Sequence, residues 1–398
     1  MRIAYLSRGN SVYDRRFLEK MVERGHQPYF ISYYPGEHVR VAGVQIYFYD
    51  YFTMHPFNRL VAVQTAWHLR RLLQRIQPDV LHTGWVQDNG LFGALCGFHP
   101  VLSMPWGSDI LIRPHDSTFA KWITRFTLNR ADLITCDSKV VKEKIISISG
   151  CSPEKVVIFP WGIDLNTFKP TRSLCQLRGI LGWRDKKILI MTRHFMPVYG
   201  IEYFIESLPT IIREEPDVRV IFIGGSEAAG ESMTTDSTKH ANDHQKTSVL
   251  LKYTEFFDEG YRSRCRKRIA EMGLGEHVYF AGLVDEGGMA ECLNAADIYV
   301  STSLSDGASC SLLEAMACGL PVVVSDTPAN FEWVQDGLNG YLVPQRNSTT
   351  LAERIIILLR GESLREQMGK RNQQIAQERA NWEANFDVLE CIYHKLVG

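Results

Sequence analysis

The chain has 398 residues, beyond the size at which one hydrophobic core stops growing, so two domains with a cleft between them are expected. Its hydrophobic fraction of 45% and charged fraction of 22% are those of a folded globular protein, which excludes a disordered or fibrous chain. A formal net charge of −1 provides no global field for nucleic acid, so no nucleic-acid partner is expected.

The cysteines and the apolar stretches indicate the compartment. The nine cysteines are odd in number and include no C-x-x-C pair, which argues against a disulfide framework and a zinc site. The opening MRIAYLSRGN becomes polar too early for a secretion signal. The longest uncharged stretch, 89–108, contains glycines and prolines that would interrupt a membrane span, so a buried helix and then a strand are expected there. The expected location is the cytoplasm.

Short apolar runs alternate with helical patterns along the first part of the chain. The expected elements are strand RIAYLS, a helix over 17–24, strand PYFIS, a helix over 59–76, strands DVLHT, PVLSMPW and DLITCD, and a helix over 139–148. This alternation is typical of a doubly wound parallel sheet. VVIFPWGID then leads to the proline-containing stretch 166–176, which is expected to link a first domain, 1–165, to a second, 177–375.

A second series repeats this architecture. It contains strand KILIMT, a helix over 201–214, strands VRVIFIGG, VYFAG and DIYVST, a helix over 311–317 and strand PVVVSD. A last helix over about 377–396, within 376–398, is expected to pack back across the domains. The segment 226–248 is polar and free of aromatic residues, so it is either a mobile insertion or a functional lid. Parallel sheets bind ligands at the carboxyl ends of their strands, so the loops that follow the strands are where chemistry is expected.

The most informative stretch is SLSDGASCSLLEAMACGLPVVVSD, where a loop of small residues runs into a helix. Asp306 lies eight positions before Glu314. The backbone amides of 309–312 are helix-start donors that favour a phosphate or sugar oxygen, and the two carboxylates can accept hydrogen bonds from sugar and ribose hydroxyls. The alternative is a turn aspartate and a solvated helix glutamate.

This block resembles the paired-acid signature E-x7-E of retaining family-4 glycosyltransferases of the GT-B fold, an α/β fold of two facing Rossmann-like domains with a deep cleft between them. The residues that match its run E-A-M-A-x-G-x-P-V are Glu314, Ala315, Met316, Ala317, Gly319, Pro321 and Val322. The resemblance implies that Glu314 holds the donor ribose. It implies that the transferred sugar is held by Asp306 with the loop Gly307, Ala308, Ser309, Cys310, Ser311 and Leu312. Asp306 is one methylene shorter than the family's glutamate, which leaves the sugar undetermined.

KILIMTRHFMPVYGIEYFIESLP resembles the family's strand, then G-R, then P-x-K-G, then a helix. Arg193 stands at the position of the diphosphate-binding arginine, whose planar fork suits phosphate. Tyr199 replaces the family's lysine. The cluster then supplies one full positive charge from Arg193 besides the helix-start amides, so Arg193 is expected to dominate the diphosphate site and Tyr199→Phe to cost little.

Further matches extend the resemblance over nearly the whole chain, including VIFPWGIDLNTFKP and FEWVQDGLNGYLV. Residues around the family's F-x-G flank the donor base, which implicates Leu283, and Gly224 at the end of VRVIFIGG is also expected on the donor side. Asp285 and Glu286 are either acceptors for guanine or solvated loop acids.

The resemblance is weaker in the first domain. Gly9 and Asn10 follow the opening strand where the family has its glycine loop near the donor phosphates, although the double glycine is absent. PWGSD resembles the family's H-G-S-D with Trp106 in place of histidine. Asp109 either orients the sugar or acceptor or caps a helix.

The resemblance implies transfer of a hexosyl-type sugar, with retention, from a UDP- or GDP-linked donor to a glycan, lipid-linked or small-molecule acceptor in polysaccharide or glycoconjugate biosynthesis. No cofactor is expected. The alternatives are a GT-B nucleotide-sugar epimerase and a catalytically degenerate sugar-nucleotide binding subunit, the latter motivated by Trp106 and Tyr199.

A peripheral contact with the inner face of the membrane is a further hypothesis for helix 59–76. Arg70, Arg71 and Arg75 cluster there near Trp67, which suits an anionic membrane surface. The alternative is that the apolar stripe of this helix packs on the sheet and the arginines are solvated.

Transfer is expected to need no metal ion, because the chain contains no D-x-D triplet of the kind that metal-dependent GT-A enzymes use. Activity should therefore be the same with and without EDTA. Loss of transfer in EDTA, with recovery only on adding Mg²⁺ or Mn²⁺, would show that a metal neutralises the diphosphate in place of Arg193 and the backbone amides.

Overall fold

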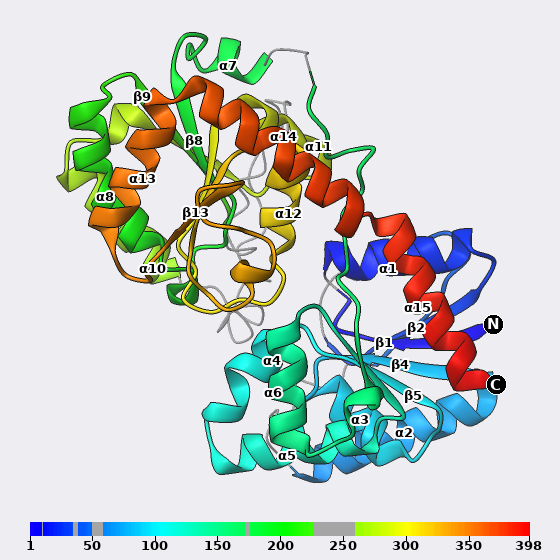
Figure 1. The fold of residues 1–398 in the computed structure, drawn as a ribbon. Helices are drawn as coiled ribbons and strands as arrows, with labels where there is room; N and C mark the ends of the chain where they lie inside the picture. Colours follow the sequence, from blue (N-terminus) through cyan, green and yellow to red (C-terminus); the bar gives the residue numbers. More distant parts are fainter. Residues whose placement is uncertain (10, 35–38, 50–58, 172–175, 226–258) are drawn as a thin grey trace, which may run out of the picture. The chain divides into compact units, whose positions relative to one another are not determined.

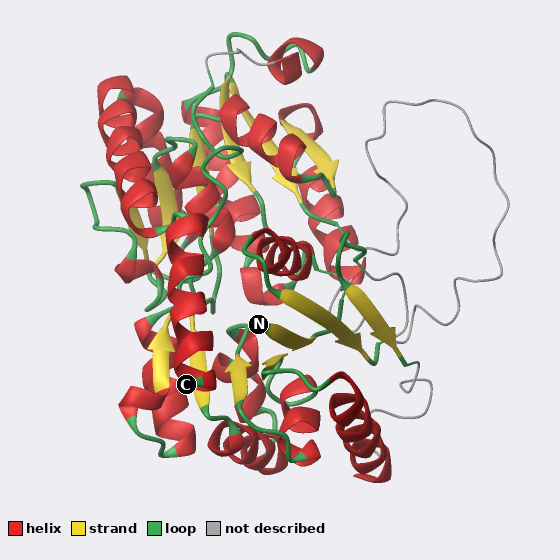
Figure 2. Cartoon of the chain, turned by 90° about the vertical axis from the view of Figure 1, so that its right-hand side faces the viewer, coloured by secondary structure: helices red, strands yellow, loops and turns green. Residues whose placement is uncertain are grey.

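The computed structural model describes residues 1–9, 11–34, 39–49, 59–171, 176–225 and 259–398. They form two compact units, 1–160 with 383–398 and 161–382. In each unit one parallel sheet has helices on both sides (Figures 1 and 2). The predicted α/β class with two Rossmann-like domains is confirmed, whereas the predicted insertion 226–248 lies outside the described residues.

The first unit contains a seven-stranded sheet in the order β3-β2-β1-β4-β5-β6-β7, and all neighbouring strands are parallel. Its strands are β1 (Arg2–Leu6), β2 (Gln27–Ser32), β3 (Gln45–Phe48), β4 (Val80–Gly84), β5 (Val101–Met104), β6 (Leu133–Cys136) and β7 (Val156–Ile158). Its helices are α1 (Val12–Glu23), α2 (Arg59–Ile76), α3 (Asn89–Cys96), α4 (Ser108–Leu111), α5 (Thr118–Arg130), α6 (Lys139–Ser149) and α15 (Trp382–Val397). Helices α1 and α15 lie on one side of the sheet, and α2, α3 and α5 lie on the other (Figure 1).

The second unit contains a six-stranded parallel sheet in the order β10-β9-β8-β11-β12-β13. Its strands are β8 (Lys187–Met191), β9 (Val218–Ile223), β10 (Val278–Gly282), β11 (Ile298–Ser301), β12 (Val322–Ser325) and β13 (Gly340–Val343). Its helices are α7 (Gln176–Ile180), α8 (Ile201–Glu214), α10 (Glu259–Glu271), α11 (Glu286–Ala295), α12 (Cys310–Ala317), α13 (Ser348–Arg360) and α14 (Glu362–Arg379).

Apolar side chains cover both faces of the second sheet, which is why its strands are nearly continuous apolar runs. Along β8, Ile188 and Ile190 enter one hydrophobic cluster, and Leu189 and Met191 enter another. Successive residues of a strand point to opposite faces, so the two clusters lie on opposite sides of the sheet. Because helices cover both sides of the sheet, the loops at the strand ends are the parts left for ligand binding.

The carboxyl-terminal region differs from the single helix expected over about 377–396. Two helices are present, and the chain between them passes through Asn381, which forms a β-bridge with Ile163. The amide of Ile163 donates to the carbonyl oxygen of Ala380, and its carbonyl accepts from Trp382. This backbone pairing interrupts the helix, so α14 belongs to the second unit and α15 to the first.

The boundary between the units also differs from the expected one after residue 165. It follows Pro160, because the next residues pack on the second unit. Ile163 pairs with the end of α14, and the ring of Phe168 is buried in a core cluster of that unit. Of the expected linker 166–176, residues 172–175 lie outside the described part. Among the helices that the structure describes, none combines the length and apolar character that a bilayer span requires.

Helix α15 is held on the first unit by buried aromatic side chains and by ion pairs. Phe386 and Tyr393 are fully buried, and the Tyr393 hydroxyl contacts Nδ1 of His82 at 2.6 Å. Burial lowers the pKa of His82 to about 3, so this imidazole is neutral at physiological pH. Lys20 of α1 pairs with Glu383 at the start of α15.

Truncation of Phe386 tests this docking. Phe386→Ala should lower the free energy of unfolding of the first unit by about 3 to 5 kcal/mol, because it removes apolar contacts and leaves a cavity. Val388 is 40% exposed on the same helix, so Val388→Ala should change the free energy of unfolding by less than about 0.5 kcal/mol. Urea denaturation followed by circular dichroism measures both, and equal effects would contradict the packing described.

Candidate active site

The strand order of the second sheet predicts where a ligand binds. The chain runs outward from β8 through β9 to β10 and then returns to β11 on the other side of β8. The neighbours β8 and β11 therefore form the switch point at which open parallel sheets bind ligands. Arg193 follows β8, and Asp306 follows β11. The loops that carry the two residues consequently meet at one edge of the sheet.

Arg193 connects these loops. Its Nη2 donates to Oδ2 of Asp306 at 2.7 Å. Its Nη1 donates to Oγ of Ser309 at 2.6 Å and to Oγ of Ser311 at 3.0 Å. The Ser311 hydroxyl also contacts the hydroxyl of Tyr299 from β11 at 3.0 Å. The guanidinium is thus oriented from several directions before any ligand arrives.

Burial determines the electrostatics of this cluster. The Arg193 side chain is 10% exposed and that of Asp306 is 19% exposed. Burial raises the pKa of Asp306, and the nearby charge of Arg193 opposes this rise without cancelling it. Burial and the Arg193 charge together lower the pKa of His194, which is therefore neutral at physiological pH. One cation and one carboxylate face each other here, so the cluster carries less net positive charge than the sequence alone predicts.

Helix α12 begins at this point. Ser309 is its N-cap residue, and the first bond within the helix runs from the amide of Leu313 to the carbonyl of Ser309. The amides just before Leu313 form the first turn, where donors face outward and the helix dipole favours an anion. Glu314 lies one turn after Ser311 on the same face of the helix and is half-buried. The predicted loop residues Gly307, Ala308, Ser309, Cys310, Ser311 and Leu312 all lie between Asp306 and this first turn.

Tyr199 contributes its ring to the cluster. The Cζ atom of Arg193 lies 4.0 Å from the centroid of this ring, a cation–π contact. The following Gly200 has a φ of 56°, and a Cβ there would lie 2.5 Å from the carbonyl oxygen of Thr302 after β11. Glycine at this position lets the segment approach β11 closely enough to place the ring over the guanidinium. Tyrosine therefore supports the arginine instead of adding the second charge that a lysine would bring.

The remaining predicted donor residues of the second unit lie after β9 and β10. Gly224 has a φ of 138°, and a Cβ there would lie 2.5 Å from the carbonyl oxygen of Arg193, so the close approach of the two strand ends requires glycine. Leu283 is half-buried and its side chain borders Gly225. Asp285 is the N-cap of α11 and accepts a hydrogen bond from the amide of Gly288 at 2.8 Å. This contact favours the interpretation of Asp285 as a loop acid over that of an acceptor for guanine.

The predicted residues of the first unit lie at the carboxyl edge of its own sheet. Gly9 follows β1, has a φ of 87°, and donates its amide to Asp14 at 3.1 Å. Asn10 lies outside the described residues. Asp109 is fully buried and accepts from the amides of Val86 and Trp106 at 3.1 and 2.9 Å. Burial raises the pKa of Asp109 to about 7, and the structure uses both of its oxygens to hold the loops after β4 and β5.

A second cluster lies at this edge, and the sequence motifs did not indicate it. The neighbours β1 and β4 form the switch point of the first sheet, and they are followed by Arg8 and Trp85. The Arg8 guanidinium lies 3.9 Å from a ring centroid of Trp85 and pairs with Asp88 at 2.6 Å. Asp88 also accepts from the hydroxyl of Tyr34 at 2.6 Å. The sequence signal for this cluster was that Arg8 and Trp85 lie within two residues of the ends of two predicted strands.

The two clusters differ in what they can bind. The Arg193 cluster offers a cation, two hydroxyls and helix-start amides, which are groups that bind phosphate oxygens. The Arg8 cluster offers aromatic rings beside a paired arginine and carboxylate, which are groups that pack on and hydrogen-bond to a polar ring. Over the described residues, no group of three or more histidine, cysteine or carboxylate side chains is arranged to hold a metal ion.

Comparison with known families decides the class of protein. Residues 176–375 match the family described as glycosyl transferases group 1. Residues 8–167 match glycosyltransferase family 4. The chain belongs to the glycosyl transferases group 1 family. This membership and the match to glycosyltransferase family 4 confirm the family that the acid-loop and Arg193 motifs resemble.

The curated relatives of this chain have diverse names. The chain is 28% identical to the spore coat protein SA of Bacillus subtilis (strain 168) over 59% of its own length and 57% of that protein. It is 29% identical to a phosphatidyl-myo-inositol mannosyltransferase of Mycobacterium leprae over 53% of its length and 46% of that protein. The match thus spans about half the length of these two relatives. With the N-acetyl-alpha-D-glucosaminyl L-malate synthase of Bacillus anthracis it shares 23% identity over 98% of its length and 94% of that protein.

Solved structures share the fold of this chain. Anabaena HepE in complex with UDP and glucose has a TM-score of 0.75 at 20% identity, over 98% of this chain and 99% of that one. The sucrose-phosphate synthase of Thermosynechococcus elongatus has a TM-score of 0.78 at 19% identity, over 100% of this chain and 99% of that one. These similarities confirm the GT-B fold.

The contact between Tyr199 and Arg193 can be tested by substitution. Tyr199→Phe keeps the ring over the guanidinium and should change transfer by less than about twofold, whereas Tyr199→Ala should weaken binding of a nucleoside diphosphate by about 1 to 2 kcal/mol. Arg193→Ala should nearly abolish turnover, because it removes the only full positive charge that we assign to the diphosphate.

Isothermal titration and turnover assays of the three variants measure these effects. If Tyr199→Phe is as damaging as Arg193→Ala, the Tyr199 hydroxyl acts on a ligand and the ring contact is not its main contribution.

Proposed function

We propose that the glycosyltransferase moves a hexosyl-type sugar, with retention, from a UDP- or GDP-linked donor to an acceptor hydroxyl. The observation that carries this proposal is the Arg193 cluster, in which a cation, two serine hydroxyls and the start of α12 lie together at the switch point of the second sheet. These groups match the negative charge of a diphosphate.

The named relatives support a nucleotide-sugar donor. The relatives include a mannosyltransferase and an N-acetylglucosaminyl malate synthase, and HepE structures contain UDP or UDP-glucose. The names give acceptors as different as malate and a phosphatidylinositol, so they do not select one for this chain. Glycan, lipid-linked and small-molecule acceptors all stay within the proposal.

Breaking the bond between the anomeric carbon and the diphosphate oxygen leaves positive charge on the sugar ring and negative charge on the leaving group. Donors that are already oriented stabilise that charge at little cost in reorganisation. We assign this role to Arg193 and to the amides around Ser309–Leu312. The acceptor oxygen bonds to the same face of the anomeric carbon, and its proton passes to an oxygen of the departing diphosphate. No metal ion takes part in this scheme.

The other predicted residues receive roles that fit their positions. We assign Glu314 to the ribose hydroxyls, and Asp306 with Gly307 and Ala308 to the transferred sugar. Leu283 and Gly224 border the nucleotide. We carry over Gly9 and Asn10 as donor-binding residues, as the resemblance implies, and we assign the reaction to the cytoplasm. Asp109 is assigned a positioning role, because backbone amides occupy both of its oxygens.

The two alternatives predict different products. An epimerase would release an altered sugar nucleotide without an acceptor product, and a degenerate subunit would bind the donor without turnover. The family membership does not favour either alternative. Chromatography of the reaction mixture separates transfer, epimerisation and unreacted donor.

A donor screen followed by one substitution tests the assignment. The matching nucleotide sugar should raise the melting temperature, because it binds the native state. Glu314→Ala should then weaken both this donor and its free nucleoside diphosphate by about 1.5 to 3 kcal/mol, since hydrogen bonds to a charged group are lost. The exposed Glu353 of α13 offers a control, and Glu353→Ala should leave both affinities unchanged. Unchanged nucleotide affinity in Glu314→Ala would contradict the ribose role.

A further inference from the structure

Three adjacent helices form one side of the first unit, and they expose large apolar side chains. Helix α3 contacts α2 on one side and α5 on the other, and the three lie along the same side of the sheet (Figure 1). Large apolar side chains on this layer are between 40% and 60% exposed, namely Val63, Trp67, Leu95, Phe119 and Trp122. Exposed apolar side chains spread over neighbouring helices are typical of an interaction surface.

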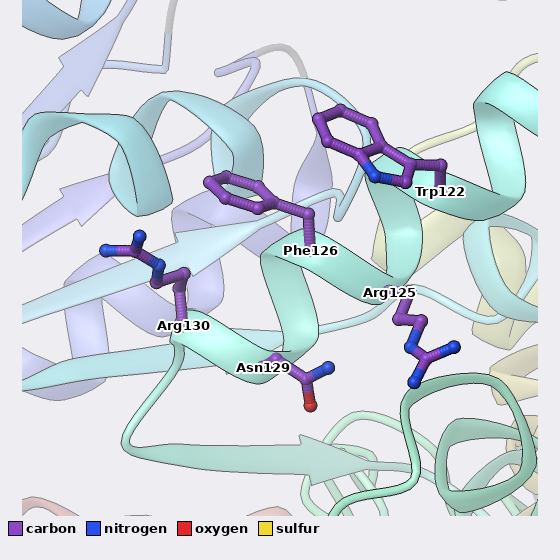
Figure 3. A pocket seen from close by; sticks show the side chains of 5 residues that line it. All are labelled: Trp122, Arg125, Phe126, Asn129 and Arg130. Atoms are coloured by element: carbon purple, nitrogen blue, oxygen red, sulfur yellow. The ribbon is translucent and has the colours of Figure 1, made fainter.

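Helix α5 carries the densest part of this surface. The rings of Phe119, Trp122 and Phe126 follow one another nearly parallel, with centroids 6.1 and 5.5 Å apart. A hollow of about 440 Å³ is lined by Trp122, Arg125, Phe126, Asn129 and Arg130. Figure 3 shows the rings of Trp122 and Phe126 on one side of the helix, with Arg125 and Arg130 on either flank. An apolar strip bordered by two cations results.

The three helices of this layer carry positive charges and no carboxylates. Neither α2, α3 nor α5 contains an aspartate or a glutamate, although the chain as a whole has a net charge of −1. The exposed cations on these helices are Arg70, Arg71, Arg75, Lys121, Arg125 and Arg130. Lys155 adds an ammonium at the end of α5, where its Nζ donates to the carbonyl oxygen of Asn129 at 3.1 Å. The surface therefore complements an extended anionic partner.

We propose that the α2–α3–α5 face docks on a bilayer containing anionic lipids, with α5 as the main contact. Phe119 and Trp122 enter the boundary between headgroups and acyl chains, and Arg125 and Arg130 bind lipid phosphates. The sequence alone indicated only helix 59–76, and its outward Trp67, with the Arg71 guanidinium 3.7 Å from the ring centroid, continues the same surface.

Two other partners fit the surface less well. A second copy of the chain, joined through the same face, would bring cations against cations. A soluble acidic glycan would satisfy the arginines but would leave aliphatic side chains such as Val63 and Leu95 in water. A lipid surface satisfies both, because it presents anionic headgroups above an apolar interior. The proposal is independent of the donor and the reaction assigned above.

Co-sedimentation of the full chain with vesicles provides the first test. Vesicles of phosphatidylglycerol and phosphatidylcholine should bring the protein down at low salt, and vesicles of phosphatidylcholine alone should not. The absence of co-sedimentation with either vesicle would overturn the proposal, and so would equal binding to both.

Charge reversal on opposite sides of the same unit shows whether α5 makes the contact. Arg125→Glu should reduce the partition onto anionic vesicles by about tenfold or more, because a cation next to lipid phosphate becomes an anion. Lys395 is exposed on α15, on the other side of the sheet, and Lys395→Glu makes the same change in net charge. If both variants lose binding equally, net charge and not the α5 face determines adsorption.

Fluorescence tests the insertion of the aromatic strip. Lipids brominated in their acyl chains should quench wild-type emission more than that of Trp122→Phe, which isolates Trp122 among the eight tryptophans. Equal quenching would overturn the insertion of Trp122. A soluble sulfated glycan that displaces the protein from vesicles, with no loss of its own binding in Trp122→Ser, would identify a glycan surface instead. Circular dichroism of each variant confirms that the exposed substitutions leave the fold intact.

Discussion

A buried cation requires an opposite charge, and this requirement organises the second unit around Arg193. Leaving the guanidinium unpaired at 10% exposure would be costly, so Asp306 from the neighbouring loop pairs with it. This pairing joins the segments after β8 and β11 and brings the serines at the start of α12 into range. The Asp306 carboxylate already neutralises the Arg193 guanidinium. We infer that a diphosphate binds by replacing Asp306 as the partner of Arg193, which frees the Asp306 carboxylate for the sugar.

The pairing of Arg193 with Asp306 is compatible with a tyrosine in place of the family's lysine. A lysine next to Arg193 would add positive charge that Asp306 alone could not balance in the absence of ligand. The Tyr199 ring instead holds the guanidinium by a cation–π contact and adds no charge. The close approaches at Gly200 and Gly224 serve the same purpose, since each lets a loop come within reach of the Arg193 segment. The site is consequently oriented before the donor binds, as electrostatic catalysis requires.

Local patterns predicted much of the fold. Apolar runs and helical spacing located most strands of both sheets, though not β3 or β13, and the helices around 59–76, 139–148 and 201–214, because those elements depend on neighbouring residues. The break between α14 and α15 could not be predicted, since it depends on a bridge from Asn381 to the distant Ile163. The boundary after Pro160 could not be predicted either, since it also depends on contacts between residues that are distant in sequence.

The candidate site, like the fold, was predicted only in part. The motif positions indicated Arg193, Asp306 and Glu314, and the strand order then explains why the first two meet. The direct pairing of Arg193 with Asp306 was missed, because spacing along the chain does not report which charges become buried together. Arg8 and Asp88 were missed for a similar reason, since they pair across the first switch point between loops far apart in sequence. The motif identified Asp109 as a candidate residue, but only the structure shows that both of its carboxylate oxygens accept hydrogen bonds from backbone amides.

The most direct test of this account is a crystal structure of the chain with the nucleoside diphosphate of its matching donor. We expect the distal phosphate to lie on the Arg193 guanidinium and the first-turn amides of α12, the ribose hydroxyls to lie on Glu314, and Asp306 to have separated from Arg193. A nucleotide bound elsewhere, with the ion pair of Arg193 and Asp306 intact, would contradict the account.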